Sequence, residues 1–168
     1  MSSTPQASAL PGVARQTHGE HPALGRPDDR DFIALKVAYR SSGGIERGDD
    51  VARWMESRST GDFVSLARLI VAGEIFSFEW HHSFWIPMFQ FDTADLSLLP
   101  TPRLVLVELA PHFDGWSLAT WFVAPHGRLG GRRPIDLLAT RLADVLAAAR
   151  SDCTDAGGPV LHEPARRA

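Results

Sequence analysis

The stretch Trp116–Leu138, WSLATWFVAPHGRLGGRRPIDLL, carries the clearest structural signals in the second half of the chain. Its first part predicts a helix over residues 115–124. Asp114 is a favourable N-cap residue, and large apolar side chains then recur with helical spacing at Leu118, Trp121 and Phe122. Pro125 ends this helix, since its ring clashes with the preceding turn and it lacks a backbone N–H.

A second helix is predicted over residues 134–139. Pro134 stands at its first position, where the missing N–H of proline costs nothing. Between the two helices lies the segment Gly127–Gly131, GRLGG, which has no hydrophobic period. The sequence therefore predicts two helices joined by a stiff, glycine-containing bend, and this bend carries three arginines, Arg128, Arg132 and Arg133.

The composition is that of an ordinary globular chain. The 168 residues carry a formal net charge of −3 and are 44% hydrophobic, which suits one domain or two small ones. This charge demands neither a nucleic-acid nor a membrane partner. The single cysteine, Cys153, excludes an internal disulfide. We expect neither a secretory signal nor a bilayer-spanning segment, and hence a cytoplasmic protein.

Both ends of the chain are rich in Ser, Pro, Ala and Gly and lack a hydrophobic period. We predict disordered tails over residues 1–30 and 151–168, with Cys153 in the second.

Residues 31–92 predict three short helices and a β-hairpin. The helices cover residues 31–40, 49–58 and 62–72. Their inward-facing residues are Phe32, Leu35, Tyr39, Val51, Trp54, Met55, Phe63, Leu66, Leu69 and Ile70. The period then changes to 2 and predicts a hairpin over residues 75–91, with Pro87 at an edge or a bulge. This order resembles the winged helix–turn–helix of excisionase and MerR-type DNA-binding proteins.

The charge of this unit does not favour DNA. Residues 31–92 contain nine acidic and six basic residues, whereas duplex binding draws much of its affinity from basic side chains that neutralise phosphates. The candidate phosphate contacts are Arg53, Arg58 and Arg68. This unit could bind operator DNA or serve only as a structural scaffold. The missing basic patch favours the scaffold.

Residues 93–150 predict a compact helical unit. Thr101 is expected to cap a helix over residues 102–110, whose LVLVELA run must be buried on most faces. A last helix is predicted over residues 141–150, which completes a four-helix unit with the two helices described first. The predicted fold class is mainly α with one β-hairpin (α+β), a winged-helix-like N-terminal unit and a small C-terminal helical bundle.

The arginines of the bend have two explanations. They precede a helix N-terminus, where a cation costs about 0.3–1 kcal/mol, so helix stability does not account for them. In the first explanation they face outward toward an acidic partner surface, and Gly130 and Gly131 allow close approach of the backbone. In the second, the bend is a solvated turn in which Asp136 pairs with an arginine locally.

The second half of the chain resembles a known family. The segment FQFD, then the stretch from Trp116 to Leu138 and the closing VLAAAR helix, are similar to the Xre/MbcA/ParS antitoxin toxin-binding domain. The match covers about residues 84–150, with His126 where the family often has asparagine. Its most specific residues are Trp121, Pro125, Leu129, Gly130, Gly131, Arg132, Pro134, Asp136 and Leu138.

This resemblance implies an antitoxin of a type II toxin–antitoxin pair, without catalytic residues or cofactor. The implied partner is a RES-domain toxin that consumes NAD, whose active-site cleft the antitoxin covers. The expected partner-binding residues are Trp121, Arg128, Leu129, Gly130, Gly131, Arg132, Arg133 and Pro134. The alternative is a DNA-binding autoregulator with a helical dimerisation or sensing domain. Operator DNA and a second copy of the chain are therefore further candidate partners.

We do not expect an enzyme. No lysine follows the glycine-rich segment, so a phosphate-binding P-loop is excluded. Ser117, His112 and Asp114 lie within six residues of one another without a nucleophile-elbow motif. The adjacent His81 and His82 would point opposite ways on a hairpin, so we expect a turn there and no metal site.

Overall fold

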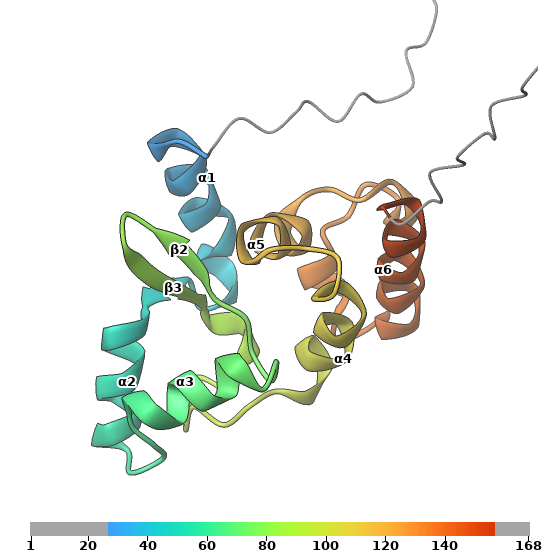
Figure 1. The fold of residues 1–168 in the computed structure, drawn as a ribbon. Coiled ribbons are helices and arrows are strands. Elements are labelled where there is room, and N and C mark those ends of the chain that lie inside the picture. The colour runs from blue at the N-terminus through green and yellow to red at the C-terminus, as the bar shows by residue number, and fades with distance from the viewer. Residues whose placement is uncertain (1–26, 157–168) are drawn as a thin grey trace, which may run out of the picture.

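The computed structural model describes residues 27–156. Most of the two predicted tails, residues 1–26 and 157–168, lies outside these described residues. Within them the chain is mainly helical with a small antiparallel sheet, which confirms the predicted α+β class (Figure 1). Among the described residues, every helix is too short or too polar to span a bilayer.

The described part of the chain alternates helices and short strands. Its α-helices are α1 Asp29–Tyr39, α2 Gly48–Ser57, α3 Phe63–Val71, α4 Pro100–Leu109, α5 Gly115–Val123 and α6 Leu142–Ala156. Its strands are β1 Ile45–Arg47, β2 Phe78–Trp80 and β3 Ser83–Pro87. Short 3₁₀ helices are η1 Arg40–Ser42, η2 Met88–Gln90, η3 Gly127–Leu129 and η4 Pro134–Leu137.

Carboxylate caps fix the starts of two N-terminal helices. Asp28 accepts a hydrogen bond from the backbone N–H of Asp31 at 3.0 Å, and the Asp31 carboxylate accepts one from Asp28, which makes a capping box. Helix α1 therefore begins at Asp29, two residues before the predicted start. Asp62 caps α3 by accepting a hydrogen bond from the Ser65 N–H at 2.7 Å.

Two side chains predicted to face the core are exposed instead. Trp54 on α2 is 39% exposed and Phe63 in the first turn of α3 is 55% exposed. Side chains from the sheet and the segments beside it fill the core between these helices, namely Ile75, Ile86 and Met88.

The sheet has three antiparallel strands in the order β1-β3-β2. Its hairpin turns at His81 and His82, both with positive φ (46° and 58°), which suits the twist of a two-residue hairpin turn. The predicted hairpin is thus confirmed, with shorter strands. Strand β1 was not predicted, because three residues carry no detectable period. It forms by pairing with β3, where Ile45 lies opposite Pro87.

Pro87 ends the central strand rather than lying at an edge or a bulge, so that prediction is wrong. Continuing the register of β2 and β3 by two residues brings Phe76 opposite Pro87, which has no N–H to donate. The Gln90 side chain fills this gap. Its Oε1 accepts from the Phe76 N–H at 2.8 Å, and its Nε2 donates to the carbonyl oxygens of Phe76 and Pro87, both at 3.0 Å.

Two hydrophobic cores form. The first contains residues of α1, β1, β2, α4, α5 and α6, and the second lies between α2, α3 and the sheet. The buried Tyr39 of α1 donates its hydroxyl to the Ala119 carbonyl of α5 at 2.7 Å. Figure 1 shows α2 and α3 at one end, α6 at the other, and α1, α4 and α5 between. The predicted boundary at residue 92 therefore does not separate two cores, since α1 shares its core with the later helices.

Two C-terminal helices differ from the prediction, one in its start and the other in its type and its end. Helix α4 begins at Pro100 with Leu99 as N-cap, so Thr101 is not the cap. The helix predicted over residues 134–139 is the 3₁₀ helix η4, which is too short to complete a regular α-helical face.

Helix α6 runs on to Ala156, so the predicted second tail is wrong for residues 151–156. Cys153 lies in this extension, packs against the first core and donates its thiol to the Glu108 carbonyl at 3.3 Å. Burial, then the negative charges of Asp152 and Glu108, raise the pKa of the Cys153 thiol. This cysteine is therefore a packing residue with little thiolate character.

Candidate functional site

The candidate site is the segment from His126 to Pro134, which we call the arginine bend. Its two ends are joined by a hydrogen bond from the His126 N–H to the Arg132 carbonyl at 3.0 Å. The His126 carbonyl in turn accepts from the N–H groups of Leu129 and Gly131, both at 3.0 Å. The bend is thus a closed loop held by its own backbone rather than an open linker.

The two central glycines have a local explanation. Gly130 and Gly131 have φ values of 67° and 76°, in the left-handed region that L side chains rarely adopt. A Cβ atom at either position would meet nothing within 4 Å. The backbone conformation of Gly130 and Gly131 therefore requires glycine. The space beside the two residues is open.

A carboxylate of α6 clasps the first half of the bend. Asp152 accepts a hydrogen bond from the indole Nε1 of Trp121 at 2.7 Å and pairs with His126 Nε2 at 2.9 Å. Because an ionised carboxylate only accepts, His126 donates from Nε2. The other ring nitrogen, Nδ1, is buried and has no partner among the described residues. The clasp ties the end of α5, the bend and α6 together.

Arg133 holds the second half of the bend. Its Nε and Nη2 both donate to the Asp136 carboxylate at 2.7 Å, and its Nη1 donates to the Ala38 carbonyl of α1 at 3.0 Å. The hydrogen bonds that Arg133 donates to Asp136 raise the pKa of Arg133 above its ordinary value. This confirms a local pairing of Asp136 with an arginine, and Arg133 is thereby turned toward its own chain.

The other two arginines remain at the surface. Arg128 is exposed, with its Nη2 3.9 Å from the Asp155 carboxylate, a distance typical of a weak surface pair. Arg132 is exposed, and its guanidinium has no ion pair or hydrogen bond within residues 27–156. Of the three arginines, Arg132 is the one whose guanidinium is presented to solvent without a described partner.

Three of the predicted partner-binding residues are part of the protein's own core. Trp121 is 8% exposed and Leu129 is 2% exposed, and Pro134 is buried as well. While packed in this way they cannot contact a partner with their side chains. They anchor the bend, whose exposed surface is left to Arg128, Gly130, Gly131 and Arg132.

The clasp leads to a first prediction. Replacing Asp152 with alanine leaves the Trp121 indole N–H and the His126 ring without their acceptor in a mostly buried place, which is expected to cost about 2 kcal/mol of unfolding free energy. The matched control is Asp155→Ala, one helical turn on, where an exposed 3.9 Å pair is worth about 0.5 kcal/mol or less. Urea unfolding measures both, and equal effects would mean that the clasp does not hold the bend.

The three arginines considered for DNA are distributed over α2, the residue that follows it, and α3. Arg53 lies on α2, and Arg58 is the C-cap residue that follows this helix. Arg53 is paired with Asp50 on the same helix, and Arg58 lines a small cavity beside Trp54. Arg68 lies on the exposed side of α3.

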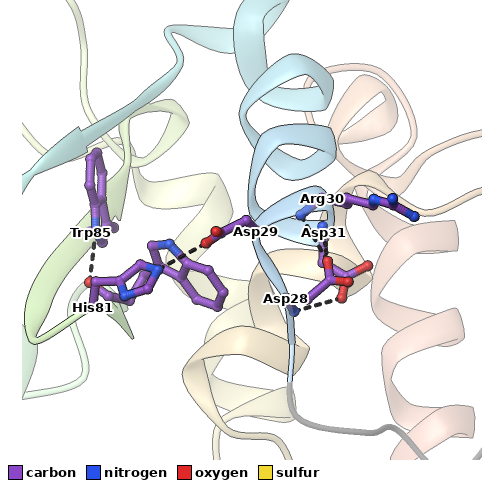
Figure 2. Close-up of polar contacts among 7 residues, drawn as sticks. Asp28, Asp29, Arg30, Asp31, His81 and Trp85 are labelled. Atoms are coloured by element: carbon purple, nitrogen blue, oxygen red, sulfur yellow. Dashed lines mark hydrogen bonds and ion pairs between the residues drawn. The ribbon is translucent and has the colours of Figure 1, made fainter.

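The tip of the hairpin is attached to α1. Figure 2 shows His81 reaching Asp29 at the start of α1, where its Nε2 lies 2.9 Å from the carboxylate. Behind the tip, Phe32 of α1 stacks on Trp80 with ring centroids 5.2 Å apart and meets Trp85 edge-on. The hairpin is therefore held against α1 rather than projecting freely.

The sequence reasoning missed Asp152 because it placed this residue in a disordered tail. A usable signal was present. Asp152 and Cys153 follow the buried Ala148 and Ala149 by three to five residues, so a helix continued past Arg150 carries them along the same side. The acceptor for Arg133 on α1, in contrast, comes from the tertiary fold and has no local signal.

Within residues 27–156 no three His, Cys, Asp or Glu side chains come together in a way that could hold a metal ion. No protein-family model, curated protein or solved structure compared with this chain matches it.

Proposed function

We propose that this protein is an antitoxin-like protein that binds a RES-type, NAD-consuming toxin and occludes its active-site cleft by contact. The observation that carries the proposal is the exposed guanidinium of Arg132 on a bend fixed from both sides. Asp152 holds one side of the bend and Asp136, through Arg133, the other. The resemblance of residues 84–150 to the Xre/MbcA/ParS toxin-binding domain names the class of partner.

Rigidity is what makes this geometry suited to inhibition. A bend already held in one conformation loses little entropy on binding, so more of its interaction energy contributes to affinity. An arginine presents a planar fork of donors that fits carboxylates bidentately. The bend would therefore complement an acidic rim at the mouth of the toxin's cleft, with Trp121, Leu129 and Pro134 as its supports.

The test is co-expression with the protein encoded beside this gene and purification of the complex. Arg132→Glu is expected to weaken binding by at least about 30-fold, as for a central interface arginine. The melting curve should stay unchanged, because Arg132 is exposed and its side chain has no hydrogen bond or ion pair within residues 27–156.

The matched control is Arg68→Glu, which reverses an exposed charge on α3, far along the chain from the bend. It should leave the complex intact. If Arg132→Glu binds as tightly as the unaltered chain, or if it unfolds the protein, the bend is not the contact surface and the proposal fails.

A second function, DNA binding, is favoured by one observation. Helix α1, strand β1, helices α2 and α3 and the hairpin β2–β3 follow in the order of a winged helix–turn–helix, with the sheet order β1-β3-β2. In that arrangement α3 would be the recognition helix. Its exposed side chains include Phe63, Val64 and Val71, however, beside a single arginine. We therefore place this function second.

This second function has its own test. Binding of the chain to its upstream DNA at about 50 mM salt, with an affinity that falls steeply as salt rises, would support it. Arg68→Gln should then weaken binding and flatten the salt dependence. If the chain does not bind DNA at low salt, the DNA-binding function is rejected. This result would leave the proposed binding of a toxin unaffected.

A further inference from the structure

A groove between α1 and α5 has features that neither proposed function uses. Its volume is about 650 Å³, within the range of small-molecule sites. Its walls are mostly apolar and include Leu35 and Ala38 of α1 and Phe113 and Trp116 beside or on α5. The groove is therefore large enough for a drug-sized molecule and would bury its apolar body.

Two carboxylates from different helices line this groove. Asp31 belongs to α1 and Asp114 is the N-cap of α5, and no lysine or arginine is among the lining residues. One oxygen of each is already bonded, Oδ2 of Asp31 to the Asp28 N–H at 3.0 Å and Oδ1 of Asp114 to the Ser117 N–H at 2.7 Å. Their second oxygens have no hydrogen bond within residues 27–156.

The half-buried Trp116 adds an aromatic face to the same groove. Its ring lies 5.4 Å from Trp80, which fixes its orientation. Aromatic faces attract cations through their quadrupole, and a neighbouring carboxylate strengthens that preference. The groove thus combines apolar walls, an ordered indole and two carboxylates without a balancing cation. Together these features favour an occupant with a positive charge.

We propose that this groove binds a small amphiphilic organic cation, such as a quaternary ammonium or phosphonium ion with aromatic arms. The apolar body lies against Leu35, Ala38 and Phe113, and the charge lies near Asp31 and Asp114. This site does not depend on the antitoxin proposal, because Asp31, Asp114 and Trp116 all lie outside the arginine bend.

The test compares two probes of matched shape and opposite charge, tetraphenylphosphonium and tetraphenylborate, by calorimetric titration of the full chain. The phosphonium should bind at least about tenfold more tightly than the borate, because two carboxylates favour the cation. In Asp31→Asn/Asp114→Asn the preference should largely disappear. Asparagine keeps the cap acceptor, so the helices stay folded, which circular dichroism checks.

The matched control is Asp62→Asn. Asp62 caps α3 with the geometry that Asp114 has on α5, each accepting an N–H at 2.7 Å, and it lies outside the groove. It should bind the phosphonium as the unaltered chain does. Thr120→Trp, which fills the groove from the exposed side of α5, should abolish binding.

Three results would overturn the proposal. The first is equal affinity for both probes, and the second is phosphonium binding that the double asparagine variant leaves unchanged. The third is no binding of the phosphonium to the full chain up to about 1 mM probe.

Discussion

Gly115→Ala is expected to destabilise the protein by about 3 kcal/mol or more. Gly115 is the first residue of α5, and a Cβ atom there would lie 2.1 Å from the Ser77 carbonyl oxygen and 3.1 Å from Phe78 Cα. Both are backbone atoms of the strand region, so neither can move aside as a flexible side chain would. Helix α5 would have to shift away from β2, which opens the first core.

Helix propensity predicts the opposite sign for this substitution. Alanine is favoured over glycine by about 0.8–1.0 kcal/mol inside a helix. The steric clash costs more than this gain in helix propensity, so Gly115→Ala is expected to destabilise the protein. The matched control is Gly127→Ala, where a Cβ atom would meet nothing within 4 Å and φ is not left-handed. It should change the unfolding free energy by no more than about 0.5 kcal/mol. Chemical denaturation measures both, and a neutral Gly115→Ala would contradict the packing of α5 on β2.

Gln90→Leu is the second substitution with a large expected effect, a loss of about 3 kcal/mol. Gln90 is 3% exposed, and its Nε2 donates to the Phe76 carbonyl in place of the N–H that Pro87 lacks. Leucine has a similar volume but leaves the Phe76 N–H and carbonyl without partners in a buried place. Unsatisfied buried groups of this kind dominate the cost, since the lost packing is small.

The control for Gln90→Leu removes a solvent-exposed hydrogen bond by an equally conservative change. Thr154→Val deletes the bond from the Thr154 hydroxyl to the Arg150 carbonyl at 2.9 Å. Water replaces that partner, so the expected effect is below about 0.5 kcal/mol. Similar urea midpoints for both variants would show that the Gln90 amide does not complete the sheet.

Local signals predicted the elements that depend on neighbouring residues. The N-cap Asp114, the helical period over residues 62–72 and the change of hydrophobic period after them correctly placed α5, α3 and the hairpin. Strand β1 could not be predicted, because three residues form a strand only when a distant strand lies beside them. The extension of α6 was not predicted, because it is mostly polar. Only Asp152 and Cys153 in this extension make the inward contacts.

In the candidate site, too, the features that depend on neighbouring residues were predictable and those that depend on the tertiary fold were not. The bend and the pairing of Asp136 with an arginine were predictable, because prolines, glycines and a three-residue spacing encode them locally. Which arginine stays exposed was not predictable. Arg133 is withdrawn by the Ala38 carbonyl of α1, a residue 95 positions away in the chain, and this leaves Arg132 at the surface.

Amide hydrogen exchange of the full chain, alone and mixed with the proposed RES-type toxin, locates the surface that a partner covers. We expect binding to slow exchange across residues 126–133 and to leave α2, α3 and the hairpin unchanged. Slowed exchange confined to α3 and the hairpin, with the arginine bend unaffected, would contradict it.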